Sequence, residues 1–197
     1  YKQSVDPEVA EAVQGTARVL GGLGHDLRED RPAFDWEVFI AATANIWAIW
    51  QAAWVLGADA GRGIWRDTVE RSVRAVAEHG CALSALDFAG SIADMNRIAR
   101  EVGPFFAGDV ILMTPTVALP PQPLGTYDAD AEGHTAQSWT DHIFAFAPFT
   151  PLFNATGQPA ISLPLAQSRS GLPIGIQFVA PFGREDLLFR LAGQLEQ

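Results

Sequence analysis

The sequence has very little cysteine, which limits its covalent chemistry. Cys81 is the only cysteine in 197 residues, so no disulfide can form within the chain. Disulfides are typical of oxidising compartments, whereas cytoplasmic proteins keep their thiols reduced. We therefore expect a cytoplasmic protein. The first residues form no apolar signal core, and the sequence starts with Tyr1 instead of Met, so we expect the gene to begin further upstream.

Positive charge is also scarce. The chain has 13 Lys and Arg residues against 23 Asp and Glu residues, which gives a formal net charge of −10. Surfaces that bind nucleic acid need clustered basic side chains to neutralise phosphates. The balance of charge therefore argues against nucleic acid as a partner.

The residues of a hydrolytic centre are missing as well. Lys2 is the only lysine, and neither Ser-x-x-Lys nor Gly-x-Ser-x-Gly occurs. Nucleophilic hydrolysis needs a hydroxyl or thiol beside a base, and arginine does not give up a proton near neutral pH. We assign no catalytic residue, and we expect the isolated chain not to hydrolyse amides or esters.

Two stretches of the sequence have residues that occur in metal or cofactor motifs. Gly21-Gly22-Leu23-Gly24 closes a predicted helix instead of opening one, unlike a dinucleotide-binding loop. A second stretch is acidic and contains histidine, but its spacing matches neither a calcium loop nor a zinc site. Its charged residues are Asp128, Asp130, Glu132, His134, Asp141 and His142. We interpret this stretch as a solvated loop, and we expect no metal and no cofactor.

What the sequence does have is a long apolar helix. Asp35 can cap a helix that runs to about Leu56, and residues 38–58 carry no charged side chain. Phe39, Trp47, Trp50 and Trp54 share one broad face of this helix. Such a face is usually buried in a core or forms the wall of a substrate pocket. We expect burial, and Trp50 is a candidate substrate-binding residue; contact with a membrane surface is the alternative.

The remaining patterns predict helices followed by strands. Residues 1–107 are predicted to be mainly helical and residues 108–197 to carry the sheet, together forming a single domain of residues 1–197. The fold class is therefore α/β. The predicted helices cover residues 7–20, 65–79, 84–102 and 185–197, the last with Leu188, Leu191, Ala192 and Leu195 inward. The predicted strands cover residues 24–29, 110–113, 160–165 and 174–179.

Four ordered segments carry a family resemblance. Residues 109–116, 149–164, 171–179 and 183–188 resemble the C-terminal part of the amidase signature family. The resemblance implies a mixed β-sheet flanked by helices, of which this chain would be an incomplete, C-terminal portion. It also implies a Ser–cis-Ser–Lys triad that forms an acyl-enzyme without cofactor or metal. None of these three triad residues can be mapped onto this sequence.

Two segments map to the substrate cleft of that family. The first is Thr114-Pro115-Thr116, which follows a predicted strand, and the second is the Asn154–Gly157 turn. Ligands of open α/β sheets gather beyond the carboxyl ends of strands, and glycine allows close backbone approach. The candidate substrate-binding residues are Thr114, Thr116, Asn154, Thr156, Gly157 and Trp50. Asn154 and Thr156 could instead only bond their own turn.

The resemblance implies a function for the complete protein. We expect a C-terminal fragment or subunit of an amidase that hydrolyses carboxylic amide bonds. Ala147 lies near the place where the tRNA-amidating branch tends to carry an acidic residue, which points to a small apolar amide as substrate. The expected partner is the missing N-terminal half, or a second copy through self-association. The alternatives are a non-catalytic binding or pseudoenzyme module, and a membrane-surface or partner-binding protein that uses the Trp-rich helix.

Overall fold

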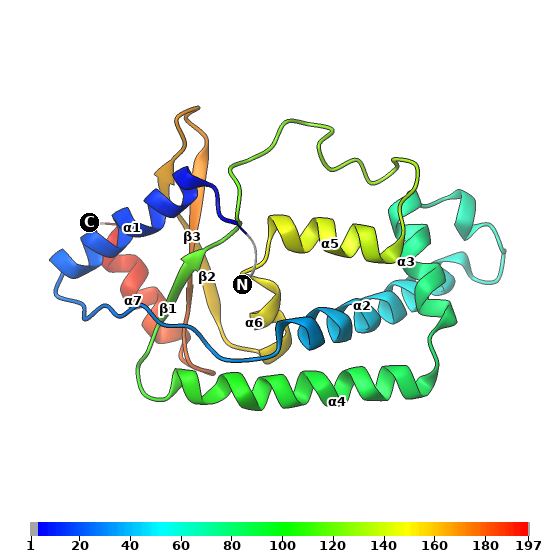
Figure 1. Cartoon of the computed structure of the whole chain (residues 1–197), viewed down its shortest axis with the longest axis horizontal. Helices are drawn as coiled ribbons and strands as arrows, with labels where there is room; N and C mark the ends of the chain where they lie inside the picture. The colour runs from blue at the N-terminus through cyan, green and yellow to red at the C-terminus, as the bar shows by residue number, and fades with distance from the viewer. Residues whose placement is uncertain (1–3, 197) are drawn as a thin grey trace. The chain divides into compact units, whose positions relative to one another are not determined.

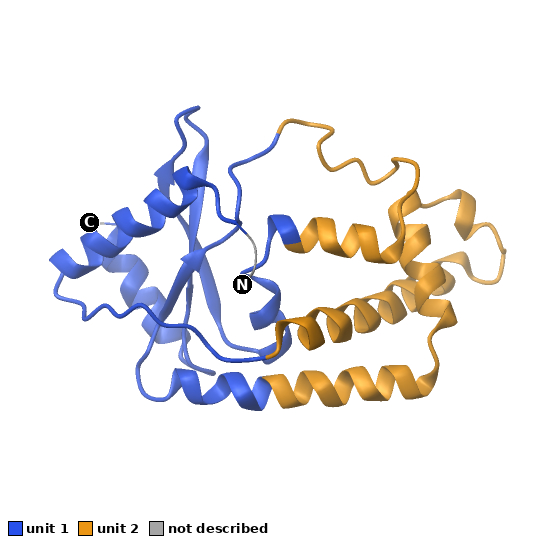
Figure 2. Ribbon diagram, in the orientation of Figure 1, with its two compact units in different colours: residues 1–34, 99–122, 145–197 blue, residues 35–98, 123–144 orange. Residues whose placement is uncertain are grey.

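The computed structural model describes residues 4–196. Figure 1 shows the elements of the whole chain, which falls into the two compact units coloured in Figure 2. Unit 1 comprises residues 1–34, 99–122 and 145–197, and unit 2 comprises residues 35–98 and 123–144. The expected single domain, with a helical half before residue 108 and a sheet half after it, divides the chain differently and stays a prediction.

The described residues form seven α-helices, two 3-10 helices and three strands. In chain order they are α1 (Pro7–Gly22), α2 (Trp36–Asp59), η1 (Trp65–Asp67), α3 (Arg71–Ala82), α4 (Ala85–Val102), η2 (Gly103–Phe106), β1 (Leu112–Pro115), α5 (Ala136–Phe146), α6 (Pro151–Thr156), β2 (Ala160–Gln167), β3 (Pro173–Val179) and α7 (Glu185–Leu195).

Unit 1 is built on a three-stranded antiparallel sheet with the order β1-β3-β2. Phe178 of the central strand lies opposite Met113 of β1 and Ile161 of β2. Because cross-strand partners share a face, these apolar side chains form one face of the sheet. The α/β fold class is confirmed. Two strands are confirmed near their predicted bounds, and the first is shifted from residues 110–113 to residues 112–115.

The apolar face of this sheet packs against α1 and α7. Asp6 caps α1 by accepting a hydrogen bond from the Glu8 amide at 2.8 Å, and Pro7 costs nothing at the first helical position. The shared core contains Val9, Leu20, Ile174, Ile176, Phe178, Leu188 and Leu191. The predictions for both helices are confirmed, including the inward Leu188, Leu191 and Ala192.

Unit 2 is helical within its described residues. The Asp35 side chain accepts a hydrogen bond from the Val38 amide at 3.1 Å and so caps α2, as predicted. The helix ends at Asp59, three residues beyond the prediction. A Cβ added to Gly80 of α3 would lie 2.0 Å from the backbone oxygen of Ala48 in α2. The two helices therefore touch backbone to backbone at this point.

The predicted helix start at residue 84 is confirmed in detail. The Ser84 amide donates to Asp87 Oδ2 at 2.8 Å, and the Asp87 amide donates to Ser84 Oγ at 3.2 Å. This reciprocal pair is a capping box with Asp in the place of the usual Glu. It opens α4, which runs to Val102 as predicted.

Two element predictions are wrong. Residues 24–29 form no strand and are exposed, because no neighbouring strand pairs with them. The predicted helix 65–79 is broken into η1 and α3. The break arises because the 123–144 segment supplies acceptors for the first amides of α3: the Arg71 amide donates to Asp130 Oδ1 at 3.1 Å, and the Ser72 amide donates to the Ala129 oxygen at 2.9 Å.

The predicted burial of the tryptophan face is wrong for Trp50 and Trp54. Trp47 is 48% exposed, Trp50 63% and Trp54 65%, whereas Phe39 on the same face is buried. Phe144 of α5 packs edge-on against Trp47 and Phe39, so α5 covers the first half of this face. On the second half, α3 packs against the opposite side of α2, where the side chains are small.

Candidate functional site

The sheet of unit 1 has a polar face opposite its apolar one. Thr114 and Ser162 both lie opposite Gln177 in the strand register, and Thr116 follows the end of β1. We call Thr114, Thr116, Ser162 and Gln177 the polar sheet face. Both threonines are predicted from the sequence. Ser162 and Gln177 are not, although an alternating pattern in β2 and β3 could have indicated them.

Hydrogen bonds order the polar sheet face. The buried Gln177 donates from Nε2 to Thr114 Oγ1 at 3.0 Å and to the Phe149 oxygen at 3.3 Å. Thr114 in turn donates to the Pro115 oxygen at 3.0 Å. Its hydroxyl proton is therefore committed to the protein, and Thr114 can offer a ligand no hydrogen-bond donor.

The hydroxyl groups of Thr116 and Ser162, in contrast, can offer a ligand a hydrogen-bond donor. Their hydroxyl oxygens are 2.6 Å apart, and one proton suffices for this bond, so the other hydroxyl can donate elsewhere. A Cβ on Gly175 would lie 2.8 Å from Thr116 Oγ1 and 3.0 Å from Ser162 Oγ. Glycine at this position therefore leaves room for the hydroxyl pair.

The second predicted segment is the end of a helix instead of an isolated turn. Asn154 and Thr156 belong to α6, and Gly157 follows as its C-cap with φ 81°. The Thr156 hydroxyl donates to the Leu152 oxygen at 2.9 Å and also contacts Gln158 Oε1. Thr156 thus serves its own helix, as the local interpretation expected. Asn154 is exposed, and its side chain makes no hydrogen bond to any described residue.

The structure therefore groups five of the six candidate residues in unit 1 and places Trp50 in unit 2. Thr114 and Thr116 lie on the sheet, and Asn154, Thr156 and Gly157 lie at the end of α6. Their role in substrate binding stays a prediction.

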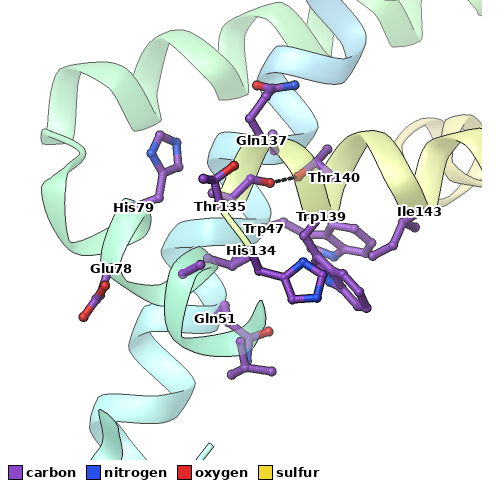
Figure 3. A pocket seen from close by; sticks show the side chains of 15 residues that line it. Trp47, Gln51, Glu78, His79, His134, Thr135, Gln137, Trp139, Thr140 and Ile143 are labelled. Atoms are coloured by element: carbon purple, nitrogen blue, oxygen red, sulfur yellow. Dashed lines mark hydrogen bonds between the residues drawn. The ribbon is translucent and has the colours of Figure 1, made fainter. Parts of the chain in front are cut away.

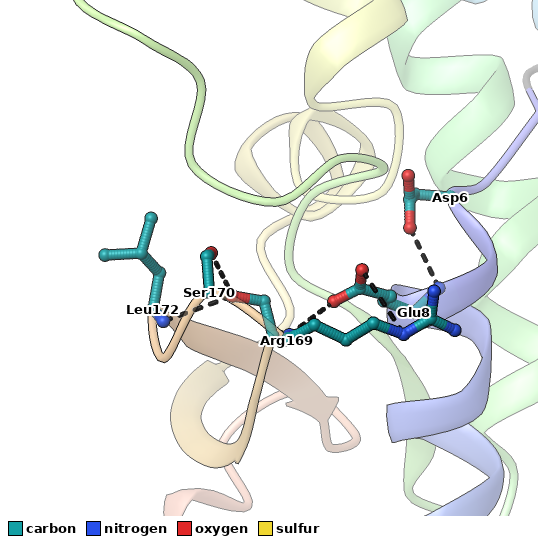
Figure 4. Close-up of polar contacts among 6 residues, drawn as sticks. Asp6, Glu8, Arg169, Ser170 and Leu172 are labelled. Atoms are coloured by element: carbon teal, nitrogen blue, oxygen red, sulfur yellow. Dashed lines mark hydrogen bonds and ion pairs between the residues drawn. The ribbon is translucent and has the colours of Figure 1, made fainter.

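Ion pairs at the surface of unit 1 join distant parts of the chain. Glu8 near the start of α1 accepts a hydrogen bond from the Arg169 amide at 2.8 Å, in the turn between β2 and β3 (Figure 4). Arg184 pairs with Asp109 and Asp186. The hydrogen bond from Arg184 holds the pKa of Asp186 below its ordinary value. These charged groups pair with one another, which suits a role in tying segments together.

Unit 2 contains a pocket that the sequence analysis missed. This pocket, here called the helical pocket, has a volume of about 650 Å³ and is lined by α2, α3, α5 and the two residues that precede α5 (Figure 3). Its lining includes Trp47, Val73, Val76, Trp139 and Ile143 among apolar residues, and Gln51, Glu78, His79, His134 and Gln137 among polar ones. Three distant segments build it, so no local motif marks it.

The acidic, histidine-containing stretch serves the fold of unit 2. Asp130 accepts from the first amide of α3, and the Asp128 backbone oxygen accepts from His134 Nε2 at 2.8 Å. Between residues 4 and 196, no three His, Cys, Asp or Glu side chains are grouped so that they could hold a metal ion.

One helix is long and apolar enough to cross a membrane by length and composition alone. It is α2, Trp36–Asp59. A single helix of this kind is a weak indication, because core helices of other proteins pass the same test.

The known proteins to which this chain is similar are amide hydrolases and proteins named as amidases. The 6-aminohexanoate-cyclic-dimer hydrolase of Paenarthrobacter ureafaciens is 34% identical over 201 residues, which cover 98% of this chain and 41% of that protein. A putative amidase AmiC of Mycobacterium leprae is 32% identical, over 100% of this chain and 41% of the relative. A solved structure of 6-aminohexanoate cyclic dimer hydrolase superposes with a TM-score of 0.87 at 31% identity, again covering 98% of this chain and 41% of its own.

The chain thus spans less than half the length of the relatives that it matches, which is consistent with the C-terminal portion expected from the sequence. The amidase family itself matches residues 1–189. The chain belongs to the amidase signature family.

Proposed function

We propose that this chain is the C-terminal part of an amidase that hydrolyses small, apolar carboxylic amides through an acyl-enzyme. The observation that carries the proposal is that nearly the whole chain matches amide hydrolases, over 41% of the length of each of these relatives. In this proposal the catalytic Ser/Ser/Lys set comes from polypeptide outside this sequence. The described residues include no lysine, since Lys2 lies outside them, and lysine is the base of that set.

The chain's own contribution in this proposal is to bind and orient the substrate. The Thr116–Ser162 hydroxyl pair has one uncommitted proton, which can be donated to an amide carbonyl. The Asn154 side chain, at the end of α6, is exposed and unpaired among the described residues and can bond an amide group in either direction. Holding the scissile amide in one orientation lowers the entropic part of the barrier.

The proposed substrate is neutral and largely apolar. The relatives include hydrolases named for 6-aminohexanoate cyclic dimer, a cyclic amide. Ala147 brings no charge to the segment between α5 and α6. The proposed partner is the remaining amidase polypeptide, and the proposed location is the cytoplasm.

The test compares the 197-residue chain with the full product of the same gene. The chain alone should neither hydrolyse an aryl amide nor be labelled on a serine by a phosphonate, whereas the full product should do both. In the full product, Thr116→Val should lower kcat/KM about tenfold, the effect of losing roughly 1.4 kcal/mol. The control is Thr126→Val, whose hydroxyl only bonds the Pro123 oxygen of its own loop.

Two results would refute the proposal. One is turnover by the isolated chain through a labelled serine, and the other is an inactive full product. A normal kcat/KM in Thr116→Val would remove Thr116 from the substrate site and leave the rest of the proposal standing.

One observation favours a second candidate function. Trp50 and Trp54 are exposed on a helix whose residues 38–58 carry no charge, and tryptophan favours membrane interfaces. A protein that binds membrane surfaces through this helix would sediment with liposomes, and Trp50→Ala would abolish the binding. The amidase proposal expects no such sedimentation.

A further inference from the structure

The helical pocket of unit 2 has the size and composition of a ligand site. Small-molecule pockets measure roughly 300–1,000 Å³ and are mostly apolar, with a few polar groups that fix orientation. The helical pocket, at about 650 Å³, combines tryptophan and valine walls with glutamine and histidine side chains. Its walls are held in place, because Gly80 lets α3 touch the backbone of α2 and Phe144 of α5 packs against Trp47.

Aromatic rings dominate one side of the pocket. Trp47 comes from α2 and Trp139 from α5, and His134 packs edge-on against Trp139 with ring centroids 5.0 Å apart (Figure 3). Aromatic groups prefer such stacked and edge-to-face surroundings. This side of the pocket therefore suits a planar ring.

Among the described residues, no unpaired carboxylate, lysine or arginine lines the pocket. Glu78 is the one lining residue with a carboxylate, and it pairs with Arg66 at 2.8 Å. No Lys or Arg side chain lines the pocket. A carboxylate ligand would lose its water without gaining a cation, which is costly. The pocket therefore favours neutral ligands.

A chain of hydrogen bonds fixes the proton on His79. Ser91 Oγ donates to the Asp87 oxygen at 2.8 Å, so it must accept the bond from Asn45 Nδ2 at 3.2 Å. Asn45 Oδ1 then faces His79 Nε2 at 3.3 Å and accepts from it. In the neutral ring, Nδ1 of His79 is left as a hydrogen-bond acceptor.

The other polar groups complete an amide-binding set. His134 Nε2 faces the Asp128 oxygen, so its neutral ring also keeps Nδ1 as an acceptor. The half-buried Gln51 forms no hydrogen bond within residues 4–196, and its carboxamide can both donate and accept. Acceptors and a matching carboxamide beside aromatic walls complement a ligand that carries a ring and an amide.

We propose that the helical pocket is a binding site for a neutral aromatic amide. The aromatic ring contacts Trp47 and Trp139, and the amide pairs with the Gln51 carboxamide. The inference does not depend on the proposed amidase function, because the pocket lies wholly within this chain and binding needs no turnover.

The test is binding of benzamide to the 197-residue chain, measured by calorimetry or ligand-detected NMR. Benzoate, which has nearly the same shape but a negative charge, is the comparison ligand. Benzamide should bind saturably, and benzoate at least tenfold more weakly. Trp47→Leu and Gln51→Leu should each weaken benzamide about fivefold. Trp54→Leu, on the same helix but outside the pocket, should leave the affinity unchanged.

Three results would overturn the proposal. They are the absence of saturable binding, equal affinity for benzoate, and equal weakening by Trp54→Leu and Trp47→Leu. Circular dichroism checks that each variant folds. If Trp47→Leu does not fold, Gln51→Leu carries the test, because leucine is well tolerated at a half-buried helical position. If benzamide does not bind but the full-length product is active, only the proposal for the helical pocket is refuted. If benzamide binds but the full-length product is inactive, only the proposed amidase function is refuted.

Discussion

The sheet of unit 1 and helix α2 of unit 2 use their apolar residues in opposite ways. In unit 1 the large side chains are inside: Ile176 and Phe178 are no more than 1% exposed, under α1 and α7. Along the second half of α2 the buried apolar residues are Ala48, Ala52 and Val55, none of which is larger than valine. The large Trp50 and Trp54 of the same helix face outward.

The difference teaches that side-chain size decides how closely elements approach, and not only which residues are buried. Small residues and Gly80 let α3 contact the backbone of α2. The same close contact leaves no space there for indole rings. The tryptophans therefore form an apolar surface that this chain does not cover, and exposed apolar surfaces of this kind usually mark interaction sites.

The largest expected effect contrasts one residue from each region. Phe178→Ala should lower the free energy of unfolding by about 3–5 kcal/mol, because it removes a fully buried ring and leaves a cavity. Trp50→Ala should change it by less than about 0.5 kcal/mol, as for other exposed positions. Urea denaturation of both variants measures the two values. A loss above about 2 kcal/mol in Trp50→Ala would show that the ring is covered in solution.

A second, smaller effect tests the close contact of α2 and α3. Gly80→Ala should cost about 2–3 kcal/mol, because the new Cβ meets a backbone oxygen that cannot move alone. The matched control is Gly90→Ala in α4, where a Cβ meets nothing within 4 Å. In Gly90→Ala the free energy of unfolding should rise by about 0.5–1 kcal/mol, since alanine is the better helix former. The helix contact would be refuted by equal melting temperatures for the two variants.

The smallest effect compares a lowered carboxyl pKa in each unit. Hydrogen bonds from Ser84 lower the pKa of Asp87 in unit 2, and Arg184 lowers that of Asp186 in unit 1. A lowered pKa in the folded state stabilises the protein above the unfolded pKa, and this contribution is lost as the pH falls through the folded pKa. Ser84→Ala and Arg184→Gln should each raise the corresponding pKa toward its ordinary value. Carboxyl NMR titration measures both shifts, and an unchanged Asp87 pKa in Ser84→Ala would contradict the capping box.

The features that could be predicted from the sequence are those that depend on residues close together in the chain. Asp35 was identified as a helix cap, and the helix starts near residues 7 and 84 were predicted correctly, because capping acts within three residues. Strands β2 and β3 were predicted near their observed bounds, at residues 160–165 and 174–179. The candidate residues Thr114 and Thr116 do lie at the end of a strand, although their contact with substrate stays a prediction.

The parts that could not be predicted depend on distant residues. Periodicity indicates that Phe39 and Trp50 share a face, but it does not tell that α5 covers only the first of them. The break before α3 depends on Asp130, far away in the sequence. Only the strand register shows that Ser162 and Gln177 lie beside Thr114 and Thr116. The helical pocket is built from three separate segments, so no local pattern predicts it.

The contact between Glu8 and Arg169 has a consequence for the synthesis of the protein. These residues are 161 positions apart, and ribosomes add about 5–20 residues per second. Roughly 8 to 32 s therefore pass between the emergence of α1 and that of the turn it binds. During this time the strand that carries Ile174, Ile176 and Phe178 has not yet been made, so Val9 and Leu20 of α1 lack their partners in the native core. Unit 2 ends at residue 144, so all its segments have emerged while the last strands of unit 1 are still being made.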